Sequence, residues 1–250
     1  MKTAERHRLK TNEFAERVAG ATQFWNANRS TVTTVAVVLL VAIVAAGAFV
    51  GYRQQRAAKA GAALSDAEAT ASAPVAPPVP GVGGTPPTPA AGTYATAEAR
   101  DQAAADKFLA VATTYGSTRE GLAARYRAAA LFAQVGRRSD AEREFKAVAD
   151  GDSGLYGRMA RLGLAELQVQ AGQYEPAIQT FRDALARQDS DLPADGLLMQ
   201  LGRTYLLAGK KAEALRSFTR VVDEHPQSLY VGEARREAEA LKAASVGKSS

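Results

Sequence analysis

Three copies of one short pattern decide the fold: Gly136-Arg-Arg-Ser-Asp-Ala141-Glu-Arg-Glu-Phe145, Gly172-Gln-Tyr-Glu-Pro-Ala177-Ile-Gln-Thr-Phe181 and Gly209-Lys-Lys-Ala-Glu-Ala214-Leu-Arg-Ser-Phe218. The copies lie 36 and then 37 residues apart. The glycine suits the left-handed end of a first helix. The small alanine then lets a second helix approach closely, and the phenylalanine one turn later fills the gap. Because such a hairpin cannot bury its apolar face alone, the pattern predicts stacked hairpins in an all-α solenoid.

The last copy resembles the tetratricopeptide repeat most closely. The residues at the signature offsets of that family are Leu198, Leu201, Gly202, Tyr205, Ala214, Phe218 and Pro226, with Leu198 in place of the usual large aromatic. Half of a further unit, around Phe108, precedes the first copy, and a helix over 228–241 is expected to cap the stack. These features predict a repeat domain over 96–243, about three full repeats with flanking helices, and a disordered tail at 244–250.

The resemblance implies a superhelix whose inner wall is built from the first helix of each pair. The candidate partner-binding residues on this concave face are Tyr126, Gln134, Met159, Glu166, Gln170, Met199 and Arg203. The alternative is that several of them pack on neighbouring repeats or on the last helix. The paired lysine and asparagine with which some family members grip a terminal carboxylate are missing, which argues against such a clamp.

A long apolar run stands near the start of the chain. Thr31–Tyr52 carries no charged residue, and as a helix it would be about 33 Å long, enough for a hydrocarbon core of roughly 30 Å. A cleaved signal peptide is the alternative, since Ala46-Gly47-Ala48 has the small residues of a cleavage site. The preceding polar segment is too long for a normal signal peptide, so a transmembrane helix is predicted.

The segments on either side of this run differ in composition. Residues 1–30 read as a cytoplasmic tail in which Phe14, Val18, Ala21 and Trp25 form one stripe of a short amphipathic helix. Residues 53–95 read as an Ala-rich extension followed by a Pro/Gly-rich linker. Seven of the ten prolines lie in this linker, which favours an extended spacer between the membrane helix and the repeats.

Composition excludes several classes of site. The absence of cysteine removes disulfides, thiol nucleophiles and lipidated cysteine anchors, and the two histidines lie in unrelated segments. We therefore predict no enzymatic activity, no catalytic residue, no cofactor and no metal. The net charge of +5 belongs mostly to residues 1–95, with 9 Lys+Arg against 5 Asp+Glu, whereas residues 96–250 hold 22 against 21. A nucleic-acid partner is thus not expected, and Glu142 and Glu144 read as exposed carboxylates.

The whole arrangement resembles bacterial single-pass inner-membrane tetratricopeptide proteins similar to the ancillary SecYEG translocon subunit family. The tail over 9–25, the apolar run and the repeats carry this resemblance, and the long proline-rich linker departs from it. It implies a cytoplasmic N-terminus, a periplasmic repeat domain and a non-enzymatic adaptor that links the export translocon to periplasmic chaperones or secretory chains. Two alternatives stay open: a scaffold for cell-envelope assembly or division, and a receptor for a small ligand or peptidoglycan fragment. Gly47 and Gly51 form a GxxxG pattern that permits a homodimer.

Overall fold

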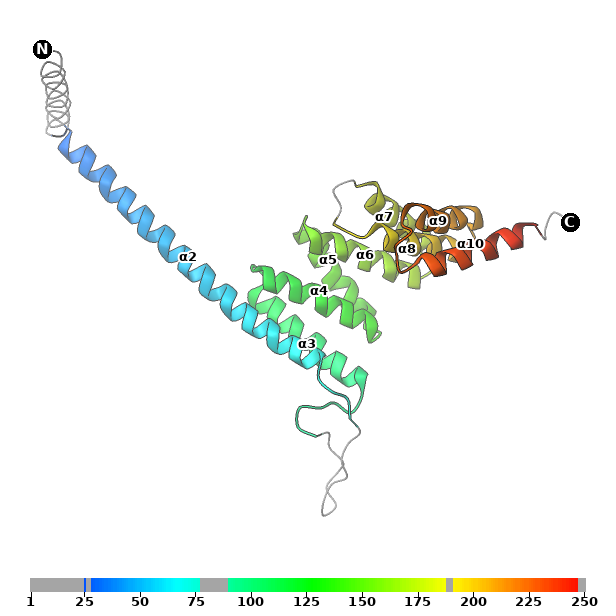
Figure 1. Cartoon of the computed structure of the whole chain (residues 1–250). Coiled ribbons are helices and arrows are strands. Elements are labelled where there is room, and N and C mark those ends of the chain that lie inside the picture. Colours follow the sequence, from blue (N-terminus) through cyan, green and yellow to red (C-terminus); the bar gives the residue numbers. More distant parts are fainter. Residues whose placement is uncertain (1–24, 26–27, 77–89, 188–190, 247–250) are drawn as a thin grey trace, which may run out of the picture. The chain divides into compact units, whose positions relative to one another are not determined.

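The computed structural model describes residues 25, 28–76, 90–187 and 191–246 and is drawn in Figure 1. Within these residues all regular structure is helical, apart from one isolated bridge. The helices are α2 Arg29–Ala71, α3 Ala97–Tyr115, α4 Arg119–Gln134, α5 Arg138–Gly151, α6 Leu155–Gln170, α7 Tyr174–Ala186, α8 Ala194–Leu207, α9 Lys211–Glu224 and α10 Val231–Val246. The all-α prediction is confirmed. Apart from Trp25, the amphipathic helix expected in the tail lies outside the described residues, as does most of the expected disordered tail.

The chain forms two compact units, Met1–Arg56 and Ala57–Ser250. In the first unit α2 carries an apolar window with a mean hydropathy of 2.6, none of which is buried. The hydroxyl of Thr33 donates to the carbonyl of Arg29 at 2.7 Å, so this polar group is satisfied within the helix. One helix of the described residues is therefore long and apolar enough to cross a membrane.

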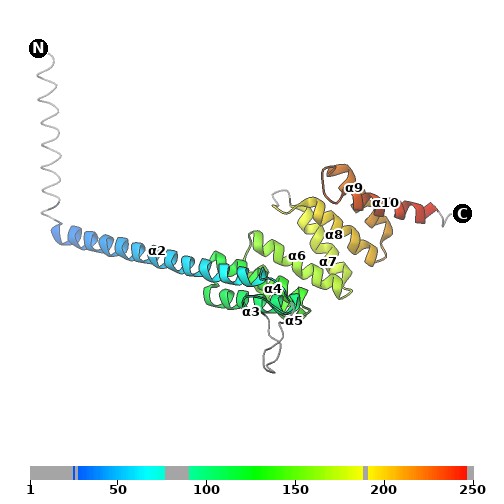
Figure 2. The same ribbon diagram turned by 60° about the horizontal axis from the view of Figure 1, so that its bottom comes forward.

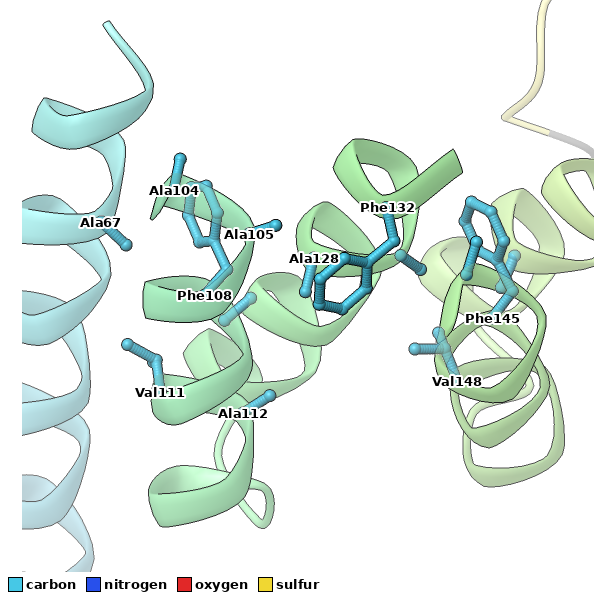
Figure 3. Packing of buried hydrophobic residues seen from close by; sticks show 14 of the residues in the cluster. Ala67, Ala104, Ala105, Phe108, Val111, Ala112, Ala128, Phe132, Phe145 and Val148 are labelled. Carbon is cyan, nitrogen blue, oxygen red and sulfur yellow. The ribbon is translucent and has the colours of Figure 1, made fainter. Parts of the chain in front are cut away.

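The second unit begins with the last turns of α2. Ala60 and Ala67 have no exposed surface, and they lie seven residues apart on one helix face. Figure 3 shows Ala67 pointing toward α3, where it joins the core that contains Phe108. Asp66 pairs with Lys107 of α3 at 2.7 Å. The second compact unit thus starts at Ala57 and contains the residues 96–243 for which the repeat domain is predicted.

The proline-rich stretch lies between α2 and α3. Val75 and Tyr94 form the isolated bridge, with Tyr94 N donating to Pro74 O and Ala76 N donating to Tyr94 O, each at 3.0 Å. Residues 77–89 lie outside the described part of the chain. The extended spacer therefore stays a prediction, since most of the proline-rich stretch lies outside the described residues.

The later hairpins close at glycines. Gly136, Gly172 and Gly209 have φ angles of 78°, 74° and 75°, a conformation that side chains disfavour. In each turn the residue after the glycine donates to a carbonyl five positions back, for example Lys210 N to Tyr205 O at 2.8 Å. This is the paired hydrogen bonding of a Schellman cap. It turns the chain sharply enough for the next helix to pack on the last.

Alanines and phenylalanines build the core that joins the hairpins. Each helix from α3 to α10 packs against the next, as Figures 1 and 2 show for the order of the second unit. Ala141, Ala177 and Ala214 have no exposed surface. A Cβ at Gly202 would lie 2.6 Å from the Phe218 ring, so only glycine lets α8 sit this close to α9.

The helix α10 ends the stack. Ala234 and Ala238 bury its inner face against α9, while Arg235, Arg236 and Glu239 are exposed on its outer face. Terminal repeats need such a polar outer surface because no further repeat covers them.

One expectation about the surface is wrong. Glu144 is only 5% exposed. Its carboxylate pairs with Arg143 at 2.8 Å and lies 3.9 Å from Arg125 on α4. A buried carboxylate is tolerated when cations and hydrogen bonds surround it, and α4 supplies one of those cations from a different part of the sequence.

Candidate functional site

A groove follows the first helices of the hairpins. It consists of two adjoining cavities of about 250 Å³ and about 180 Å³. Leu162, Glu166 and Leu192 line both cavities, so the cavities meet at these residues. We call the pair the inner groove.

The first cavity brings together four of the predicted partner-binding residues. Tyr126 comes from α4, and Met159, Glu166 and Gln170 come from α6. Tyr126 and Gln170 therefore line the same cavity, although they are 44 positions apart in the sequence. The wall is mostly apolar, with Phe145 at its side.

The other three predicted residues are engaged within the protein. Gln134 donates to the Asp101 carboxylate at 3.1 Å. Met199 is 1% exposed and belongs to the core between α8 and α9. Arg203 donates to Glu233 of α10 at 2.6 Å. The inner groove that we describe does not include these three side chains.

Tyr126 is fixed by its aromatic neighbours. Its ring centroid lies 5.7 Å from that of Phe145 and 6.0 Å from that of Tyr156, both in tilted arrangements that favour ring contact. Burial raises the pKa of the Tyr126 hydroxyl, and the nearby charge of Glu166 raises it further. The phenol is therefore neutral at physiological pH and available as a hydrogen-bond donor.

Glu166 lies where the two cavities meet. Part of its side chain is exposed at the groove opening, yet the groove walls displace enough water that desolvation raises the pKa of the carboxyl. Its carboxylate accepts one long hydrogen bond from Gln200 of α8, at 3.4 Å. Glu166 is therefore a partly desolvated acid with one long hydrogen bond and no ion pair among the described residues.

A family model described as a tetratricopeptide repeat-like domain matches residues 22–235. The chain belongs to this family. The matched residues include the apolar part of α2 as well as the helices that line the inner groove, so the tetratricopeptide family pattern extends beyond the three obvious copies.

One solved structure is a modest match. A crystal structure of nearly identical TPR-like repeats, from a Podospora anserina protein described as a kinesin light chain, is 18% identical with a TM-score of 0.46. The match covers 58% of this chain and 86% of that one. No curated protein matches the chain.

Some lining residues of this tetratricopeptide groove that the sequence did not predict lie outside the helices. Leu192 comes from the connection before α8, and Tyr230 comes from the turn before α10. Neither follows the helical spacing from which the other candidates were chosen. The sequence indicates Leu192 only as an apolar residue that directly precedes Pro193, just before α8.

Two other cavities border the same helices. A cavity of about 260 Å³ beside α6 and α7 is lined by Arg158, Arg161 and Arg187 together with Asp183. A wider one of about 640 Å³ lies between the second helices α7 and α9, and we call it the outer groove. Its wall holds six charged side chains: Glu175, Arg182, Lys210, Glu213, Arg216 and Arg220.

Proposed function

We propose that this protein is a membrane-anchored, non-enzymatic adaptor that binds a segment of a partner protein in the inner groove. The observation that carries the proposal is the convergence of Tyr126, Met159, Glu166 and Gln170 on one cavity. Rigid aromatic and adaptable thioether side chains next to a few polar groups are typical of surfaces that bind polypeptides. The family assignment supports the same role.

The size of the cavities favours a polypeptide over a small ligand. Sites for drug-sized molecules are concave spaces of about 300–1,000 Å³ that bury most of the ligand. Each of the two cavities, of about 250 Å³ and about 180 Å³, is smaller than this, and the two share lining residues. Such a pair suits successive side chains of one extended segment.

The apolar stretch of α2 supports the anchor. We propose that it spans the bacterial inner membrane with the N-terminus in the cytoplasm and the repeat domain in the periplasm. The tail over 1–30 carries six Lys and Arg residues, which favours its retention in the cytoplasm. A reporter enzyme that works only in the periplasm should be active when it is fused after residue 250. Activity of a reporter that works only in the cytoplasm would show the opposite orientation.

For the partner, we propose the export translocon on the membrane side and chaperones or secretory chains on the repeat side. The test is photocrosslinking of the intact protein in its own membrane, with a photoreactive residue at Tyr126 or Met159. Gln179, in the outer groove, is the matched control position. We expect crosslinks to translocon, chaperone or secretory chains from the first two positions and none from the third.

The same experiment separates the proposal from a structural scaffold. Crosslinks from Tyr126 and Met159 that reach only a second copy of this chain, or only division proteins, would remove the adaptor role. Equal crosslinking from Gln179 would show that the inner groove is not the binding surface.

A further inference from the structure

We infer that the inner groove recognises a segment that places one lysine or arginine side chain on Glu166, between apolar side chains that enter the two cavities. The inference rests on the proposed function and adds the chemistry of the segment. The occupant to which it commits is a separate polypeptide of the order apolar, basic, apolar.

Charge distribution is the first argument. Among the described residues that line the two cavities, Glu166 is the only one with a charged side chain. The rest of the lining is apolar or neutral, including Tyr126, Gln170, Gln200 and Tyr230. A cation that enters this groove meets one carboxylate and no competing positive charge from its walls.

The second argument is that Glu166 has no internal cation, whereas two other carboxylates of this unit, Asp101 and Glu233, have one. Asp101 pairs with Arg100 at 2.7 Å, and Glu233 pairs with Arg203 at 2.6 Å. No lysine or arginine of the described residues forms an ion pair with Glu166 within 4.0 Å. Glu166 therefore lacks a cation among the described residues, and a basic side chain of a partner can supply one.

Desolvation strengthens the preference for a cation. Glu166 is exposed at the groove opening, and partial desolvation by the groove walls raises the pKa of its carboxyl. An ammonium or guanidinium group restores the lost stabilisation through a charge-assisted hydrogen bond, which is stronger than a neutral one.

The shape supplies the flanking residues. On one side of Glu166 the cavity is lined by Tyr126, Phe145 and Met159, and on the other by Phe181, Leu197 and Tyr230. Apolar side chains of an incoming segment would be removed from water in both places, at a gain of about 25 cal/mol per Å². The basic residue then sits between two apolar contacts rather than at the end of a charged run.

The test is a selection from a library of random 12-residue peptides displayed on phage, against the full chain in lipid nanodiscs. The wild-type protein should enrich peptides with one Lys or Arg between apolar residues. Glu166→Lys should enrich peptides with Asp or Glu at that place. The affinity of a selected synthetic peptide should fall at least about tenfold in Glu166→Gln, as expected for the loss of a charge-assisted bond. Glu175→Gln, in the outer groove, should leave the affinity unchanged.

Two further variants make the outcomes distinct. Leu162 lines both cavities, so Leu162→Arg should abolish selection if peptides bind in the inner groove. Peptides that still bind this variant, or the absence of any selected peptide with the wild type, would contradict the proposed function itself. Peptides that require Leu162 but lack a basic residue, or that are insensitive to Glu166→Gln, would overturn only the present inference.

Discussion

The inner and outer grooves of the repeat unit differ in volume and in the number of charged side chains that line them. The outer groove is larger, about 640 Å³ against about 250 Å³ for the larger inner cavity, and six charged side chains line it. Several of these charges are already paired, such as Lys210 with Glu175 at 2.7 Å. The inner groove is smaller and contains one carboxylate without an internal cation. A single carboxylate in an otherwise uncharged wall is a better guide to binding than volume, because the cation of a partner can form a charge-assisted hydrogen bond with it.

The largest effect that separates the grooves is expected from Phe145→Ala. Phe145 is 4% exposed and lines the cavity beside Tyr126, so its removal should lower the free energy of unfolding by about 3–5 kcal/mol. It should also weaken peptide binding in the inner groove. Urea unfolding and peptide titration check both.

Phe218→Ala is the control for this variant. Phe218 is fully buried between α8 and α9 and does not line either inner cavity. We expect a similar loss of stability with unchanged peptide affinity below the unfolding transition. Equal losses of affinity in both variants would mean that binding depends on overall stability rather than on the groove wall.

The second effect is a pH dependence that only the inner groove should show. A cation binds the charged form of Glu166, so affinity should be full above the pKa of the free groove and should fall as the pH drops through it. Because desolvation raises that pKa above the ordinary value of 4.5, the loss should begin at a higher pH than for an exposed glutamate. Tyr126, which also faces the groove, stays neutral over this range because burial raises the pKa of its hydroxyl.

Peptide titrations across this pH range measure the effect, with Glu166→Gln as the control. The variant should bind weakly and with a flat profile. A wild-type profile as flat as that of the variant would contradict the role of Glu166.

A smaller effect is expected where a turn supports both grooves. Gly172 joins α6 to α7 with a φ of 74°, and a Cβ there would meet nothing within 4 Å. Gly172→Ala should therefore lower the free energy of unfolding by about 1–2 kcal/mol through backbone strain alone. Gly61→Ala, within α2 and equally free of contacts, should instead raise it by about 0.5–1 kcal/mol. Thermal or urea unfolding measures both changes. If the two variants change the free energy of unfolding in the same direction, the backbone strain assigned to position 172 is wrong.

The smallest effect is expected in the outer groove. Lys210→Gln breaks the pair with Glu175, whose side chain is 68% exposed. Exposed ion pairs add little to stability because water and salt screen them. We expect no measurable change in Tm or in peptide affinity. A clear loss of affinity would move the binding surface to α7 and α9.

The hairpins could be read from the sequence because their determinants are local. The glycine with positive φ, the alanine five residues later and the phenylalanine one helical turn after that lie within ten residues of sequence. The same is true of the charge-free run in α2. Both features therefore appear as fixed spacings, which a reader of the sequence can count.

The packing of the end of α2 against the repeats could not be predicted from local spacing. The end of α2 is rich in alanine, and alanine gives a weak periodic signal because its burial removes little surface from water. Ala67 is buried because it packs in the core that contains residues of α3, and α3 follows only after the proline-rich stretch. The burial of Glu144 depends in the same way on Arg125 from another helix.

Within the groove, the helical spacing located one cavity and not the second. Tyr126, Met159, Glu166 and Gln170 follow from the first-helix positions, whereas Leu192 and Tyr230 lie in connections whose path no periodicity describes. Met199 has the right spacing for the inner wall and yet lies in the core. Side chains at the edge of a helix stripe turn inward or outward according to the neighbouring repeat.

The bridge between Val75 and Tyr94 bears on how this protein folds and how its length can change. It closes the stretch between α2 and α3, while the other hairpins close through short turns. Loop-closure entropy grows slowly, by about 0.6 kcal/mol for each doubling of loop length. Insertions or deletions between these two residues should therefore be tolerated over evolution. Contacts of high sequence separation also form late, so the end of α2 should pack on α3 last, on a stack that begins with α3 and α4.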